Sequence, residues 1–128
     1  MSKVVIAETE GLTLTLTFDG DNLNARLAGG GLVAETTAGV EREALARFFA
    51  DAVTLKAPTY GRWEYKASDD AIVLHAEPVE EDKVLLAIIL LASSLDNADW
   101  QADGTITVSA STWAAIAREV AAITEAQQ

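Results

Sequence analysis

The amino-acid sequence predicts an α+β fold: a curved antiparallel sheet of about six to eight strands with two amphipathic helices, the last one C-terminal. Three observations support this fold class. Apolar and polar residues alternate over several short segments, as in strands that are buried on one face. Turns rich in glycine and aspartate separate those segments. Two longer segments repeat their apolar residues at helical spacing.

The N-terminal third predicts an antiparallel meander. GLTLTLTF at 11–18 alternates strictly, so its leucines lie on one face and its threonines on the other. The turn sequence DGDN at 19–22 leads into a second strand, NLNARLA. GGG at 29–31 supplies the next turn and leads into a strand over 32–40. A further strand over 3–8 begins the meander.

The segment EREALARFFADAV at 41–53 predicts the first helix. Acidic residues in its first turn suit the positive end of the helix dipole. Two strands follow: GRWEYKA at 61–67, which alternates aromatic and charged residues, and AIVLHAE at 71–77, after which EPVEED forms a connection. The apolar residues of the helix recur at i, i+3, i+4 and i+7, and are Leu45, Phe48, Phe49 and Ala52.

The least polar stretch of the chain is VLLAIILLA at 84–92. It contains neither glycine nor proline, and its length and composition suit a strand. Because its side chains are apolar on both faces, we expect a central strand that is covered on both sides. A helix packed on the sheet would cover one face, and a curled sheet, a second helix or another subunit would cover the other.

The last part of the sequence predicts a strand running into a C-terminal helix. The strand spans 98–108, with a turn or bulge near Asp103–Gly104. Ser109 is the expected N-cap of the helix, and Val108 and Trp113 occupy the two positions of a hydrophobic staple. The apolar stripe of this helix consists of Trp113, Ile116, Ala117, Val120 and Ile123.

The bulk properties describe one acidic domain over residues 1–128, because domains usually contain about 100 to 150 residues. Twenty acidic residues against nine basic ones give a net charge of −11, which disfavours nucleic acid and anionic membrane as partners. The absence of cysteine excludes disulfides and fits a reducing compartment, so we expect a cytoplasmic protein. No apolar run is long enough to cross a bilayer as a helix, and no signal peptide is recognisable.

The residues with catalytic or metal-binding chemistry form no recognisable motif. His75 is the single histidine, and only Glu77 lies near enough in sequence to join it in a metal site. Asp96, Asp99 and Asp103 offer oxygen ligands of the kind calcium uses, but their spacing does not match an EF-hand loop. We therefore assign no catalytic, metal-binding or cofactor-binding residue.

The whole layout resembles that of small bacterial proteins of unknown function. The residues that carry the resemblance are Leu45–Phe49, Trp63, the LHAE strand that ends at Glu77, and DWQADGTITVSASTW. Small acidic proteins of this kind include immunity proteins, which neutralise toxins, and phage-borne inhibitors of host defence. The resemblance implies a binding role.

We therefore expect non-catalytic binding of a basic protein partner through an acidic surface. One alternative is a small-ligand binder or enzyme with a pocket between sheet and helix. Another is a structural homo-oligomer, in which the second face of 84–91 meets its copy. None of these functions needs a cofactor. The predicted partner-binding residues are Tyr60, Glu77, Glu80, Glu81, Asp82, Asp96, Asp99, Trp100 and Asp103.

Overall fold

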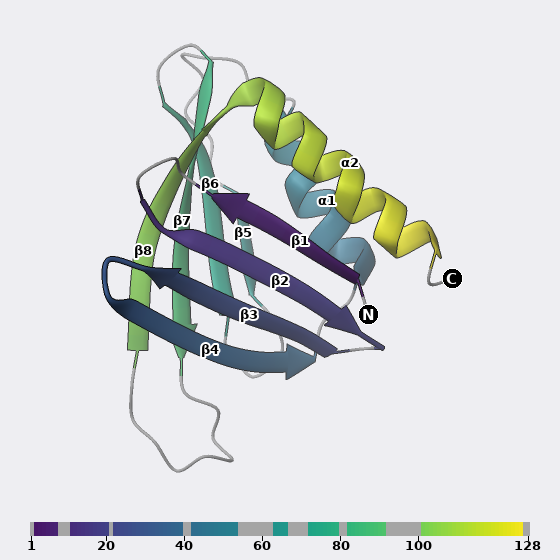
Figure 1. The fold of residues 1–128 in the computed structure, drawn as a ribbon. Helices are drawn as coiled ribbons and strands as arrows, with labels where there is room; N and C mark the ends of the chain where they lie inside the picture. Colours follow the sequence, from purple (N-terminus) through teal and green to yellow (C-terminus); the bar gives the residue numbers. More distant parts are fainter. Residues whose placement is uncertain are drawn as a thin grey trace.

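Two four-stranded antiparallel sheets face each other, and two helices lie along one side of them (Figure 1). The α+β class, the antiparallel strands and the C-terminal helix are confirmed, but the prediction of a single curved sheet is wrong. Alternation shows which side chains of a strand are buried, and it does not show where one sheet ends and the next begins. The structure is a computed structural model that describes residues 2–7, 11–20, 22–39, 42–53, 63–66, 72–79, 82–91 and 101–126.

Sheet A is the N-terminal meander, with strand order β1-β2-β3-β4. Its connections from β2 to β3 and from β3 to β4 are two-residue turns, as the glycine-containing turn sequences predicted. Gly30 and Gly31 both have a positive φ angle, at 56° and 85°. Residues with a Cβ atom rarely adopt such angles. The strands of sheet A are β1 (Ser2–Ala7), β2 (Thr13–Asp19), β3 (Asn22–Gly29) and β4 (Leu32–Gly39).

Sheet B repeats this arrangement after the first helix, α1, which spans Arg42–Val53 and confirms the helix predicted at 41–53. Its strand order is β5-β6-β7-β8, and the apolar segment predicted at 84–92 forms the central strand β7, as predicted. The strands of sheet B are β5 (Trp63–Lys66), β6 (Ile72–Val79), β7 (Lys83–Leu91) and β8 (Gln101–Ser109).

The C-terminal helix, α2, spans Ala110–Ala126. Its N-cap is confirmed, because the backbone N–H of Thr112 donates a hydrogen bond to Ser109 Oγ at 3.2 Å. Within the described part of the chain, neither helix is long and apolar enough to span a membrane.

The inner faces of the two sheets form one hydrophobic core. In sheet A, Leu14 and Leu16 on β2 are fully buried, while the threonines between them are not. In sheet B, Leu86 and Ile88 on β7 are fully buried as well. Strand alternation therefore turns the predicted apolar face of each sheet toward the other sheet, and β7 contacts both sheet A, through β4, and the helix that follows sheet B in the chain.

The two halves of the chain have the same order of elements, four strands followed by a helix. The helices also share a sequence pattern, ALARFFA at 44–50 and AIAREVA at 115–121, whose buried positions include Leu45 and Ile116. Each helix contacts the first strand of the other half, α1 with β5 and α2 with β1. The halves are thus interlocked.

Trp113 joins the two helices at the centre of the core. Its side chain is fully buried, and its indole N–H donates a hydrogen bond to the backbone carbonyl of Phe49 at 2.9 Å. Its ring centroid lies 5.0 Å from that of Phe49 and 6.3 Å from that of Phe48. A residue of the second half therefore donates a hydrogen bond to a backbone carbonyl of the first helix.

The predicted turn or bulge near Asp103–Gly104 is wrong, because β8 pairs with β7 in unbroken register through these residues. A Cβ atom at Gly104 would clash with Cδ1 of Leu12, the residue just before β2 of the facing sheet. The glycine thus allows a close approach of the two sheets at this point, and no turn is needed to explain it. The strand β6 also runs farther than predicted, through Pro78, which pairs opposite Val84.

Replacing Trp113 with phenylalanine is expected to lower the free energy of unfolding by about 2–4 kcal/mol, because it leaves a cavity and removes the indole hydrogen bond to the Phe49 carbonyl. Urea unfolding followed by far-UV circular dichroism measures the change. Glu119→Ala, an exposed substitution on the same helix, should change stability by less than about 0.5 kcal/mol. Equal effects of the two substitutions would show that Trp113 does not hold the helices together.

Candidate functional site

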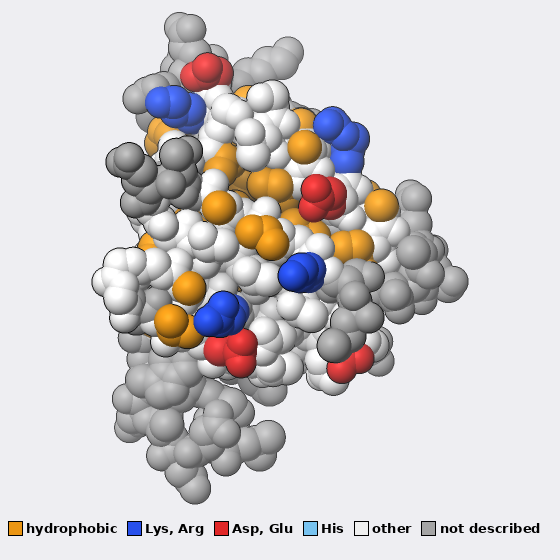
Figure 2. Space-filling view, viewed as in Figure 1, with side chains coloured by type: hydrophobic (Ala, Val, Ile, Leu, Met, Phe, Trp, Pro, Cys, Tyr) orange, Lys and Arg blue, Asp and Glu red, His pale blue; other side chains and the backbone are white. Residues whose placement is uncertain are grey.

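The outer faces of the two sheets differ in chemistry. The outer face of sheet A is mostly polar, although it also carries Val5 and Val33, which are 47% and 61% exposed on its two edge strands, and Figure 2 shows apolar and charged side chains among its other groups. The strand β2 contributes Thr13, Thr15 and Thr17 to this face, and Asn24 on β3 donates a hydrogen bond to Thr37 Oγ1 on β4 at 3.0 Å. Such a surface is well suited to contact with water.

The outer face of sheet B carries an apolar surface, which we call the sheet B patch and define as the half-buried Leu85, Ala87 and Ile89 together with Val73, which is only 9% exposed. The register places Val73 beside Ile89, and the two remaining members follow on alternate positions of β7. The side chains on β7 are half-buried, as are Thr15 and Thr17 in the corresponding inner strand of sheet A. The prediction that both faces of β7 are covered is therefore confirmed for the inner face only.

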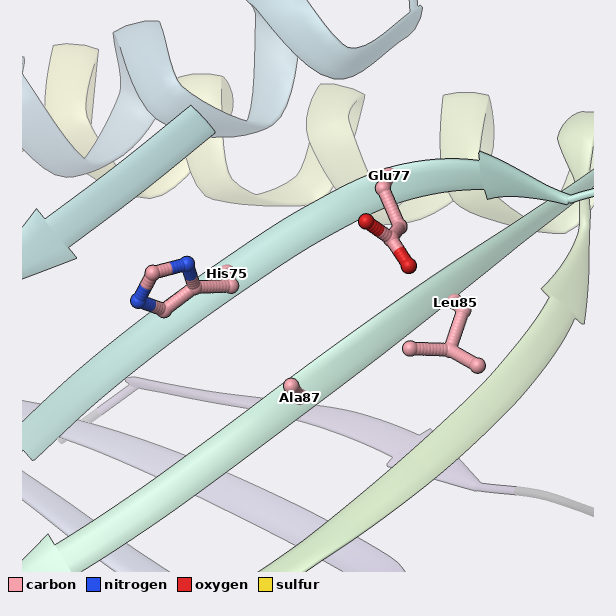
Figure 3. A pocket seen from close by; sticks show the side chains of 4 residues that line it. All are labelled: His75, Glu77, Leu85 and Ala87. Atoms are coloured by element: carbon pink, nitrogen blue, oxygen red, sulfur yellow. The ribbon is translucent and has the colours of Figure 1, made fainter. Parts of the chain in front are cut away.

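A hollow of about 130 Å³ lies at one end of the patch. It is lined by His75 and Glu77 from β6 and by Leu85 and Ala87 from β7, and all four side chains project from the same side of the sheet (Figure 3). Strand pairing fixes their positions, because His75 is opposite Ala87 and Glu77 is opposite Leu85. Alternate residues of each strand thus build a site with an apolar floor beside an imidazole and a carboxylate.

This hollow lies on the face of sheet B that points away from the helices (Figure 3). The alternative function had expected a pocket between sheet and helix, but buried Trp113, Phe49 and Leu45 belong to the core there. The hollow contains one histidine and one carboxylate, and no group of three or more potential metal ligands occurs among the described residues. Its chemistry therefore favours recognition of an apolar or basic group.

Three of the predicted partner-binding residues lie in the described structure. Glu77 and Asp103 both belong to the outer face of sheet B, where Glu77 is paired with Leu85 and Asp103 with Ile89. They therefore stand near opposite ends of the patch. Asp82 is exposed in the turn between β6 and β7, and its carbonyl accepts a hydrogen bond from the Ala110 N–H at 2.7 Å. The predictions for Tyr60, Glu80, Glu81, Asp96, Asp99 and Trp100 fall outside the described residues.

Sequence reasoning missed the apolar members of this surface. Leu85, Ala87 and Ile89 lie in the segment that predicted a buried central strand, so they were assigned to the core. The sequence of β8, which pairs with β7, did indicate which face of sheet B points outward. Thr105 and Thr107 alternate there with Ile106 and Val108, so the threonine side is the outer one.

No family model matches the chain, and no curated protein or solved structure matches it. The resemblance to immunity proteins and phage inhibitors therefore remains a prediction. Support for a function comes from the surfaces of this chain.

Two neighbouring substitutions on β7 test whether its outer face is open. Ile88→Thr, on the inner face, should lower the free energy of unfolding by about 3 kcal/mol or more, because it removes buried carbon and places a hydroxyl in the core. Ile89→Thr, on the outer face, should cost about 1 kcal/mol or less. Urea unfolding gives both values. Equal losses would mean that both faces are covered and that the patch is not available for binding.

Proposed function

We propose that this protein binds a basic protein partner through the outer face of sheet B, without catalysing a reaction. The partner would place apolar side chains on the sheet B patch and lysine or arginine side chains beside Glu77 and Asp103. The observation that supports this proposal most directly is the contrast between the two outer faces. The outer face of sheet A is mostly polar and its exposed valines, Val5 and Val33, lie apart on opposite edge strands, whereas sheet B gathers its apolar side chains at the centre, with acidic residues at the ends.

The apolar centre would supply most of the binding free energy. Apolar patches surrounded by polar residues mark interaction sites more often than isolated exposed apolar residues do. A hollow of about 130 Å³ is similar in size to the engineered cavity of about 150 Å³ that holds a benzene molecule. The hollow beside His75 is therefore large enough for one side chain of the partner, which would act as an anchor in the interface.

The acidic residues would supply orientation and a fast encounter. The net charge of −11 attracts a basic protein over a distance of about one Debye length, and carboxylates at opposite ends of the patch favour one orientation of the bound partner. Neutralisation of a toxin or inhibition of a host defence protein would use such a surface. The absence of cysteine suits a binding protein that works in the cytoplasm, where thiols stay reduced.

The charge contribution is tested with a matched pair of substitutions, Asp103→Lys on the patch and Glu119→Lys on α2. Both residues are exposed and both substitutions change the net charge equally. The purified protein is immobilised and exposed to a lysate of its source organism, and the recovered proteins are identified by mass spectrometry. Asp103→Lys should lose a basic partner that Glu119→Lys retains.

Raising the salt concentration from about 0.1 M to about 0.5 M should release the same partner, because the Debye length shrinks from about 10 Å to less than half of that value. Ile89→Thr should also lose it while remaining folded. The proposal is wrong if the recovered partners are neutral or acidic, or if the substitutions at 103 and 119 have equal effects.

A further inference from the structure

The strand β4 is an edge of sheet A with which no other described strand pairs. It lies at the end of the strand order, and Figure 1 shows no described strand or helix beyond it. The other edge of sheet A, β1, contacts α2, and the edge strand β5 of sheet B contacts α1. An uncovered edge presents unpaired backbone groups to any strand that can align with it.

The hairpin between β3 and β4 determines which backbone groups point outward. In a hairpin with a two-residue turn, the residues that flank the turn form a hydrogen-bonded pair, and such pairs alternate along the strands. Gly29 and Leu32 flank the turn, so the N–H and C=O groups of Val33, Glu35 and Thr37 point away from β3. No hydrogen bond from these outward backbone groups to another described residue is present.

Thr36 marks the middle of this edge with an unsatisfied polar atom. Its side chain points to the inner face and is only 6% exposed, and Thr36 Oγ1 has no hydrogen-bond partner. Buried hydroxyls in folded proteins are nearly always hydrogen-bonded. A strand that paired with β4 would place a side chain directly opposite Thr36, on the same inner face.

We propose that β4 pairs antiparallel with β4 of a second copy of this chain, with the two Thr36 residues opposite each other. The two sheets A then join into one continuous sheet around a twofold axis. Each Thr36 hydroxyl becomes the hydrogen-bond partner of the other, a pairing that occurs between threonines on adjacent strands. This self-association uses an edge of sheet A and leaves the sheet B patch exposed.

The backbone pattern and the side chains select this register. It places Glu35 opposite Thr37 of the second copy, and the outward backbone groups of both residues form hydrogen bonds there. Shifting the pairing by one residue on each chain in one direction places Glu35 opposite Glu35, so that like charges meet. The same shift in the other direction places Thr36 opposite Ala38 and leaves its hydroxyl unpaired.

The net charge gives this interaction a salt dependence opposite to that of the proposed function. Two chains that each carry a charge of −11 repel each other, so added salt should tighten the dimer. The same salt should weaken the binding of a basic partner. Failure of one proposal is therefore distinguishable from failure of the other.

Cysteine substitution tests the register, because the chain contains no cysteine of its own. In a pair that is not hydrogen-bonded, the opposing Cα atoms are about 4.5 Å apart, which lies within the range that a disulfide requires. Thr36→Cys should therefore form a covalent dimer on mild oxidation. The matched control is Ala34→Cys, which also points inward on β4 but would lie about 13 Å from its copy.

Charge substitution at Thr37 tests the same register on the exposed face. Thr37→Lys places a lysine opposite Glu35 of the second copy and should lower the dimer dissociation constant about fivefold to tenfold. Thr37→Glu places two carboxylates together and should raise it by a similar factor. Both substitutions remove the Thr37 hydroxyl that accepts from Asn24, and sedimentation equilibrium measures both constants.

Val5→Lys and Val5→Glu are the charge controls, because Val5 is 47% exposed on the opposite edge strand, β1. They should change the dissociation constant less than the substitutions at 37. The proposed dimer is wrong if the protein sediments as a monomer at all concentrations and salt conditions, or if Ala34→Cys crosslinks as readily as Thr36→Cys. It is also wrong if lysine and glutamate at 37 act in the same direction.

Discussion

The burial of two apolar sheet faces against each other is the constraint on which the rest of this structure depends. Each strand contributes alternate side chains to the shared core, and strand register then determines which residues point outward. Trp113 completes the core by stacking on Phe49 and hydrogen-bonding its carbonyl. The helices close one side of the sandwich, so they position neither of the two surfaces to which we assign an interaction.

Much of the local structure could be predicted from the sequence, because it depends on local patterns. Strict alternation identified β2, helical spacing identified most of the buried residues of both helices but not Thr124, and the residue before α2 was correctly identified as its N-cap. The pairing of strands into two sheets could not be predicted. A strand has the same alternation of apolar and polar residues whether the next strand joins its sheet or begins another sheet. Gly104 shows the same limit, since its role depends on Leu12, which is distant in the sequence.

The candidate site was predicted only in part for a related reason. Acidic residues draw attention in a sequence of charge −11, and Glu77 and Asp103 do lie on one outer face. The apolar residues between them could not be separated from the core by composition. A strand with apolar residues on both faces is equally consistent with a strand between two layers and a strand with one face open for a partner. Only the placement of sheet A distinguishes the two.

The two proposed interactions use different physical features of the chain. The sheet B patch offers side chains, whereas β4 offers backbone groups and one buried hydroxyl. Leaving a hydroxyl such as that of Thr36 unpaired costs about 1–3 kcal/mol, which is a noticeable part of the stability of a small domain. The proposed dimer accounts for a threonine in an otherwise apolar inner face, because the second strand supplies the hydrogen-bond partner that its hydroxyl lacks.

The interlocked arrangement of helices and strands also affects how the chain reaches its native state on the ribosome. Sheet A and α1 are synthesised first, but the strands that cover the inner face of sheet A follow later, and α2 comes last. Until then the leucines of β2 and β3 have no covering layer, and the nascent chain exposes an apolar surface. Most native contacts between the halves are distant in sequence, which slows folding and lengthens that interval. A holding chaperone that shields apolar strands would therefore matter most for this protein before its last helix leaves the exit tunnel.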